Sequence, residues 1–230
     1  MPTVHATHAT LICLVRHGET DWNTEKRLQG QIDIDLNAVG VTQARAVRPG
    51  LQGQQFAAIY SSDLVRAWRT AQIASADLGV AVTAAPDLRE RHYGVYQGLT
   101  STEAAVKHPE IHSLHQSRSP DFDYLGGESL AAFAERVMSG LTVLADRHRG
   151  QRILGFTHGG VLDVVYRAAV GRTLETPRDF SIPNAALNWL EYTAGTHAGH
   201  WRLVEWANIA HLRHIQEAEQ ITEVRDEVMH

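Results

Sequence analysis

The chain has almost no cysteine, no long apolar run and no excess of positive charge, and each absence excludes a class of protein. Cys13 is the only cysteine among 230 residues, which excludes an internal disulfide and favours a reducing compartment. No apolar stretch approaches the length of a membrane span, and the first ten residues lack the basic start and apolar core of a signal peptide. The net charge of -5 provides no basic field for nucleic acid or an anionic membrane. We therefore expect a cytoplasmic protein without nucleic-acid or membrane partners.

Histidine, in contrast, is abundant, and the 14 histidines raise the question of a metal site. Three pairs are separated by two residues: His5 and His8, His197 and His200, His211 and His214. On a helix this spacing places both rings on one face. However, no cysteine and no close group of carboxylates accompanies them at the spacing of a zinc site. We expect no metal.

Short apolar runs alternate with helical patterns through most of the chain. Strands are expected at 11–15, 57–60, 80–84, 152–156, 187–192 and 201–206. Helices are expected at 38–48, 63–78, 101–108, 128–149 and 161–169, with a lid-like connection up to residue 127. This alternation predicts one α/β domain, a three-layer α/β/α sandwich with a mostly parallel sheet and helices on both faces.

The domain is expected to span residues 11–206. Residues 1–10 are predicted to form a flexible N-terminal arm, and residues 207–230 a charged C-terminal tail.

The first apolar run ends in residues suited to phosphate chemistry. Residues 11–15 read as a strand buried on both faces, and Arg16, His17 and Gly18 follow directly. Ligands of open α/β sheets bind at the carboxyl ends of strands. Arginine offers a forked donor, histidine a nucleophile or base, and glycine a close approach of the backbone. On these three residues alone, an ordinary strand end with a charged rim fits equally well.

The longer motif VRHGETDWN, residues 15–23, resembles the signature of the histidine phosphatase superfamily, which includes the phosphoglycerate mutases. Further matches are the segments SSDLVRA around Arg66, LRERHYG around Glu90 and the strand end at His158. The resemblance extends over about residues 11–206 and implies the phosphoglycerate mutase-like fold.

The resemblance also implies roles for individual residues. His17 is the expected nucleophile and Glu90 the expected proton donor and acceptor, while Arg16, Arg66 and a protonated His158 hold the phosphate. Six more residues are assigned to substrate or phosphate binding: Asn23, Gln29, Gly30, His92, Tyr93 and Gly159. Tyr96, His112, His115, Phe122 and Tyr124 are available for an aromatic wall of the same pocket.

Elementary chemistry explains this combination of residues. A phosphate dianion repels nucleophiles, so cations and donors must hold its charge. The attacking imidazole must be neutral at its reacting nitrogen, and the leaving alkoxide needs a proton from Glu90. We expect the fastest turnover on the acidic side of neutral.

The motifs leave three functions open. The sequence ERHYG, with YQG after it, is similar to the mutase version of this loop. However, Ser101 stands where bisphosphoglycerate-dependent mutases carry a lysine, and residues 100–127 hold only Lys107 and Arg118 as permanent cations. We therefore favour a phosphohydrolase that acts on small phosphomonoesters through phosphohistidine. The alternatives are a phosphoglycerate mutase with 2,3-bisphosphoglycerate as cofactor and a non-catalytic phospholigand-binding protein. A homo-oligomer is compatible with either enzyme.

Overall fold

The first strand, β1 (Thr10–Arg16), lies inside a six-stranded sheet of order β3-β2-β4-β1-β5-β6 in the computed structural model, which describes residues 9–195 and 199–213. The other strands are β2 (Ala58–Ser61), β3 (Val82–Ala84), β4 (Arg152–Thr157), β5 (Leu187–Thr193) and β6 (His200–Asn208). β4 pairs in parallel with both β1 and β2, and β2 pairs in parallel with β3. β5 is antiparallel to both β1 and β6. The mostly parallel sheet is confirmed, and β1, β2 and β4 end at one edge.

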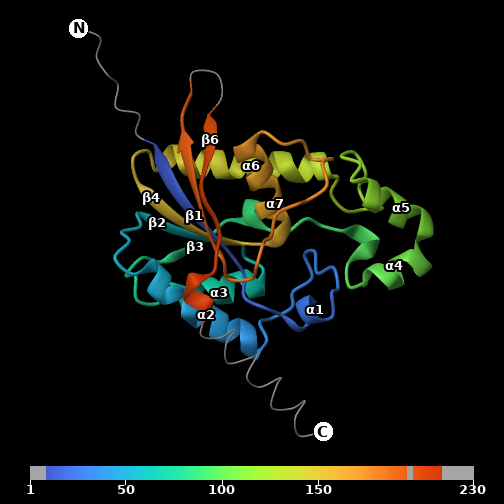
Figure 1. Cartoon of the computed structure of the whole chain (residues 1–230), viewed down its shortest axis with the longest axis horizontal. Helices are drawn as coiled ribbons and strands as arrows, with labels where there is room; N and C mark the ends of the chain where they lie inside the picture. The colour runs from blue at the N-terminus through green and yellow to red at the C-terminus, as the bar shows by residue number, and fades with distance from the viewer. Residues whose placement is uncertain (1–8, 196–198, 214–230) are drawn as a thin grey trace, which may run out of the picture.

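Helices cover both faces of this sheet, as the alternating pattern predicts (Figure 1). α2 (Ala38–Leu51) and α3 (Val65–Ala74) pack together on one face, and α6 (Leu130–Arg147) and α7 (Gly159–Val170) on the other. The short α1 (Asp21–Thr24), α4 (Ser101–Lys107) and α5 (Pro109–Ser117) lie together at one end of the molecule (Figure 1). Three 3₁₀ turns are η1 (Pro86–Leu88), η2 (Gly94–Tyr96) and η3 (Ala210–Leu212).

Successive side chains of β1 enter two different cores, because strand residues alternate between the faces of a sheet. Ile12 and Leu14 belong to the core under α6 and α7, while Cys13 and Val15 belong to the core under α2 and α3. All four are essentially inaccessible to water. Burial raises the pKa of the Cys13 thiol, so this cysteine acts as an apolar packing residue, as its position in the strand predicts.

Two predicted helix ends are wrong. α2 continues through Pro49 to Leu51, because a proline in the last turn removes a single hydrogen bond and Leu51 is buried against the sheet. α3 stops at Ala74, four residues early, because the Ser75 hydroxyl donates to the carbonyl of Ala71 at 2.7 Å and the chain turns toward Gly79.

The predicted lid-like connection contains a second helix. Pro109 is the first residue of α5, a position where the missing N–H of proline costs no hydrogen bond. No helix was expected between residues 108 and 128, because a proline inside a helix breaks it, whereas Pro109 stands at its start. Arg118 ends α5 in a left-handed conformation with φ 53.

The structure also describes the borders of the domain. β1 begins at Thr10, β6 continues to Asn208, and Leu212 packs into the core beside α2. The rest of the predicted arm, residues 1–8, and of the predicted tail, residues 214–230, lies outside the described residues. Within residues 9–195 and 199–213, no helix combines the length and apolar character needed to cross a membrane.

Candidate active site

The parallel register of β1 and β4 brings the two histidine-bearing strand ends together. Arg16 lies opposite Thr157, and the backbone N–H of His17 donates to the carbonyl of Thr157 at 2.9 Å. The rings of His17 and His158 consequently lie with their centroids 5.2 Å apart. Two segments separated by about 140 residues thus supply one site.

A cavity of about 120 Å³ opens beside these strand ends. Its lining consists of Arg16, His17, Asn23, Arg27, Leu28, Gln29, Gly30, Arg66, Glu90 and Tyr93. The structure therefore brings together most of the residues that the sequence analysis assigned to catalysis and phosphate binding. Its size and its two buried arginines suit a phosphate group.

His17 is held as a neutral imidazole. Its Nδ1 lies 2.7 Å from the carbonyl of Gly18, and because a carbonyl can only accept, Nδ1 carries the proton and Nε2 keeps its lone pair. Burial, followed by the charges of Arg66 and Arg16, lowers the pKa of His17 well below its ordinary value. The Asn184 amide donates to the backbone carbonyl of His17 at 2.9 Å and fixes the same strand end.

Arg16 and Arg66 each donate to backbone carbonyls through their terminal nitrogens, but their Nε donors stay free within the described part of the chain. Arg66 is 1% exposed and donates to the carbonyls of Gly30 and Ile32 at 2.7 and 2.9 Å, and Arg16 donates to that of Ile182 at 2.5 Å. Within residues 9–195 and 199–213, the buried Nε atom of each arginine has no hydrogen-bond partner. Burial lowers the pKa of each to about 10, so both stay cationic at neutral pH. Orphaned cationic donors in a cavity favour an anionic ligand.

The protonated His158 expected from the sequence belongs to a site that holds phosphate, and the ring has a different state without that charge. Burial, then the charges of Arg66, His17 and Arg16, lowers its pKa well below the ordinary value. Its Nε2 lies 2.8 Å from the Ser62 hydroxyl, while its buried Nδ1 has no partner. A neutral ring follows, because two cations already occupy this space, and protonation would require the added negative charge of a phosphate ester.

Glu90 reaches the site from the loop after η1. Its Oε2 accepts from the backbone N–H of Gly160 at 2.9 Å, and its Oε1 accepts from that of Arg91 at 2.8 Å. A Cβ atom at position 160 would lie 2.1 Å from Glu90 Oε1, so a larger residue there would displace the carboxylate from this position. The first turn of α7 thereby positions the carboxylate beside the strand ends.

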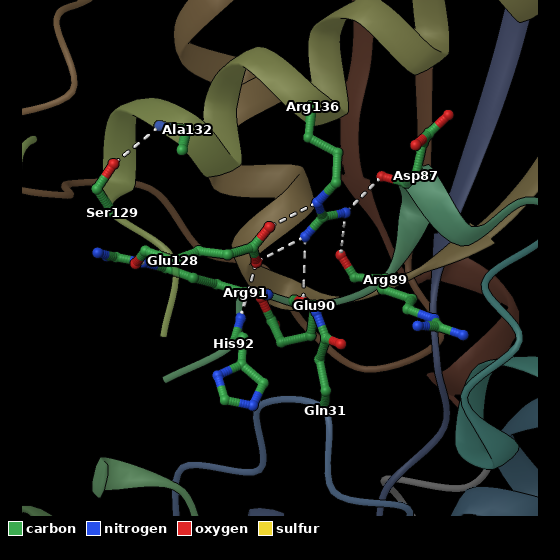
Figure 2. Close-up of polar contacts among 10 residues, drawn as sticks. All are labelled: Gln31, Asp87, Arg89, Glu90, Arg91, His92, Glu128, Ser129, Ala132 and Arg136. Carbon is green, nitrogen blue, oxygen red and sulfur yellow. Dashed lines mark hydrogen bonds and ion pairs between the residues drawn. The ribbon is translucent and has the colours of Figure 1, made fainter. Parts of the chain in front are cut away.

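Arg136, on α6, ties down the loop that carries Glu90 (Figure 2). Its guanidinium group donates to the carbonyls of Asp87, Arg89 and Glu90 at 2.9, 3.2 and 3.4 Å. It also forms a two-pronged ion pair with Glu128, at 2.7 and 2.8 Å. The second oxygen of Glu128 accepts from the His92 backbone N–H at 2.9 Å. Arg136 thus holds residues 87–90 directly and His92 through Glu128.

Sequence reasoning missed Arg136, Glu128, Ser62 and Asn184. Ser62 directly precedes the helix expected at 63–78, and Glu128 is the first residue of the helix expected at 128–149, whose actual N-cap is Ser129. Arg136 lies in an amphipathic helix pattern, where an arginine gives no sign of such contacts. Only the fold brings these residues to the site.

The remaining expected residues are spread more widely. Tyr93 lines the 120 Å³ cavity and, together with Gly159, a larger adjoining cavity. His92 lines neither, and instead contacts the Gly94 N–H and the Gln97 amide. Of the expected wall residues, His115, Phe122 and Tyr124 line the larger cavity, whereas Tyr96 is fully buried.

Metal ligation finds no support in the described part of the chain. Residues 9–195 and 199–213 contain no group of three or more His, Cys, Asp or Glu side chains arranged to hold a metal ion.

We predict that the folded protein loses stability in acid, because His17 and His158 are buried as neutral rings. The unfolded chain takes up protons near a pH of about 6.5, whereas the folded pKa values of His17 and His158 are lower. Below that pH the unfolded state binds more protons, so the free energy of unfolding decreases as the pH falls, by up to about 1.4 kcal/mol per pH unit for each ring.

Urea denaturation between pH 7 and 5.5 measures this dependence of the free energy of unfolding on pH. His158→Gln should reduce it, and the exposed control His200→Gln should not; equal slopes in all three proteins would contradict the argument.

Comparison with known proteins agrees with this geometry. The model of the histidine phosphatase superfamily (branch 1) matches residues 12–209. Metal-independent phosphoserine phosphatase of Arabidopsis thaliana is 40% identical over 206 residues, which cover 88% of this chain and 83% of the relative. Phosphoglycerate mutase-like protein 4 of the same plant is 39% identical over 204 residues, 87% and 86% of the two chains.

A solved structure of a phosphatase also matches this chain in fold and sequence. Mycobacterial glucosyl-3-phosphoglycerate phosphatase matches with a TM-score of 0.74 and 30% identity, over 85% of this chain and 98% of that chain. The fold and the strand-end motifs agree with these relatives, and the chain belongs to the histidine phosphatase superfamily.

Proposed function

We propose that this protein hydrolyses small phosphomonoesters through a phosphohistidine intermediate at His17. The observation that carries the proposal is the state of that ring. It is neutral, its tautomer is fixed by the Gly18 carbonyl, and it lies beside the buried Arg66 and the half-buried Arg16. The Nε donors of both arginines have no partner among the residues that the structure describes. Such a ring can attack phosphorus, and such donors can hold the charge that repels the attack.

In the first step, Arg16, Arg66 and Asn23 hold the phosphate oxygens. His17 Nε2 forms a bond to phosphorus while the bond to the ester oxygen breaks. Glu90 gives its proton to that oxygen, and a neutral alcohol leaves. The Gly160 N–H holds the Glu90 carboxyl on the side of the leaving oxygen.

In the second step, water takes the place of the alcohol. The Glu90 carboxylate removes a proton from the water as the water oxygen bonds to phosphorus. The bond between phosphorus and Nε2 then breaks, inorganic phosphate leaves, and His17 and Glu90 return to their initial states. The arginines provide the charge compensation throughout, so we propose a metal-independent reaction, the property stated in the name of the phosphoserine phosphatase relative.

Hydrolysis is favoured over the mutase alternative by the charges above the site. A mutase must hold a small, highly charged intermediate and keep water from phosphohistidine. Residues 100–127 hold Lys107, which is exposed, and Arg118, which is already paired with Asp163 at 2.9 Å. A non-catalytic binding role would leave the fixed tautomer of His17 and the placement of Glu90 without a purpose. The lone buried Cys13 is consistent with a cytoplasmic location.

Replacement of His17 tests the nucleophile. His17→Asn should lower the hydrolysis of p-nitrophenyl phosphate by more than about 1000-fold, because no covalent intermediate can form. The control His200→Asn, at an exposed position, should retain full activity. An alkaline quench of the unmodified enzyme with ³²P-labelled substrate should trap an acid-labile protein-bound phosphate. Isomerisation of 3-phosphoglycerate without phosphate release, with 2,3-bisphosphoglycerate present, would favour the mutase.

Replacement of Glu90 tests the proton donor. Glu90→Gln should slow the hydrolysis of an alkyl ester such as glycerol phosphate by roughly 10²–10⁴-fold. The loss should be smaller for p-nitrophenyl phosphate, whose aryl leaving group needs no proton. Steady-state rates on both esters measure the difference, with the exposed Glu135→Gln as control. The same loss on both esters would rule out Glu90 as the proton donor.

Arg136 should act as a positioning residue for Glu90. Arg136→Met frees the loop of residues 87–92, and a misplacement near 1 Å costs about 100-fold in rate. We expect that loss in kcat on glycerol phosphate and less than about tenfold on p-nitrophenyl phosphate, because only the alkyl ester depends on the proton. Arg147→Met, at an exposed position on the same helix, is the matched control. A purely structural role would lower both rates equally.

A further inference from the structure

A second, larger cavity adjoins the phosphate-sized one, and Glu90 lines both. Its volume is about 330 Å³, and its lining shares Arg16, Leu28, Glu90 and Tyr93 with the smaller cavity. In the proposed reaction the leaving oxygen must lie at Glu90. The part of the substrate beyond that oxygen therefore extends into the larger cavity.

One wall of the larger cavity is apolar and aromatic. The side chains of Phe122, Tyr124 and Phe180 contribute to it, together with Leu114 and Leu130. Phe122 and Tyr124 pack against each other with ring centroids 4.8 Å apart. This wall suits the carbon skeleton of an alcohol, and carries no charge to pair with an ion.

The charged residues of the same cavity have an excess of positive charge. Besides Arg16, its lining contains Arg91, Arg118 and Arg178, and its acids are Glu90 and Asp163. Four cations thus face two carboxylates, in a protein whose net charge is -5. This local excess favours a ligand with negative charge beyond the phosphate itself.

Most of these arginines already have partners within the protein. Arg91 donates to the carbonyls of Phe122 and Glu128 at 2.8 and 2.9 Å. Arg118 donates to the Leu174 carbonyl and to Asp163, both at 2.9 Å. Asp163 also pairs with the buried Arg167.

Arg178 is different, because among residues 9–195 and 199–213 it has no ion-pair partner. It is exposed at the cavity and lies in the segment between α7 and β5. The same segment contacts the catalytic residues, through the Ile182 carbonyl at Arg16 and the Asn184 amide at His17. Burial and, to a smaller extent, the charge of Arg178 lower the pKa of Arg16, so the two guanidinium groups interact across the cavity.

We infer that the larger cavity holds the leaving alcohol of the substrate and that Arg178 binds a carboxylate on that alcohol. A carboxylate fits better than a second phosphate, because the single charge of Arg178 balances one carboxylate. A phosphate dianion would need a second free cation, and Arg91 and Arg118 are already committed to carbonyls and Asp163. The inference rests on the proposed function for the phosphate-sized cavity. It adds the substrate class: phosphomonoesters of hydroxy acids.

A binding experiment in the His17→Asn background tests this inference without turnover. Calorimetry compares 3-phosphoglycerate with racemic glycerol phosphate, which has a hydroxymethyl group in place of the carboxylate. We expect 3-phosphoglycerate to bind more tightly by roughly 10–100-fold, the range for a charged hydrogen-bonded pair. Adding Arg178→Gln should abolish this preference and leave glycerol phosphate binding within about twofold. Arg178→Lys should retain part of the preference, because it keeps the charge without the fork.

The matched control is Arg45→Gln, an exposed arginine on α2, which packs on the opposite face of the sheet. It should change neither affinity. Equal affinities for the two esters before Arg178 is changed, or an equal loss of both on Arg178→Gln, would overturn the carboxylate site while the phosphate cavity stands. Failure of both esters to bind would instead reject the phosphate cavity, and with it this inference.

Discussion

The site depends on keeping an imidazole neutral while two guanidinium groups are buried beside it. Arg66 is buried and Arg16 is half-buried, so water solvates their charges poorly. Burial of the rings, and then the charges of these arginines, lowers the pKa of both His17 and His158. The backbone carbonyls of Gly30, Ile32 and Ile182 compensate part of the cost of that burial. The arrangement favours a dianion, which neutralises the cations without competing for the lone pair of the nucleophile.

This arrangement in turn requires the parallel pairing of β1 with β4. A shift of one residue in that register would move Arg16 away from Thr157 and turn every side chain of β1 to the opposite core. The same apolar residues that stabilise the two cores therefore determine where the proposed catalytic groups lie. The proposed reaction and the folding of the chain share one set of constraints.

The sequence predicted the fold class, the strands around the site and the superfamily, because buried strands and strand-end motifs are local signals. The motif VRHGETDWN and the segments around Arg66, Glu90 and His158 likewise placed the residues that the structure gathers. The sequence did not predict α5 or the end of α2, because a proline is compatible with the first or the last turn of a helix and breaks a helix elsewhere. Pro109 lies in the first turn of α5 and Pro49 in the last turn of α2. Nor could the sequence predict the contacts of Arg136, Asn184 and Arg178. These depend on long-range packing, and an arginine in a helix or loop looks the same with or without such contacts.

The two cavities have different origins in the chain. The end of β1, the start of α3 and the loops 27–30 and 90–93 line the phosphate-sized cavity, whereas half of the lining of the larger one comes from α5, the loop after it and the segment before β5. Those segments contribute no strand to the sheet, so they can change in length and composition while the sheet and its strand ends stay intact. During evolution, new substrate preferences can therefore arise by exchange of peripheral segments, with the reaction itself inherited unchanged. Relatives with one fold and differently named substrates are the expected outcome of that separation.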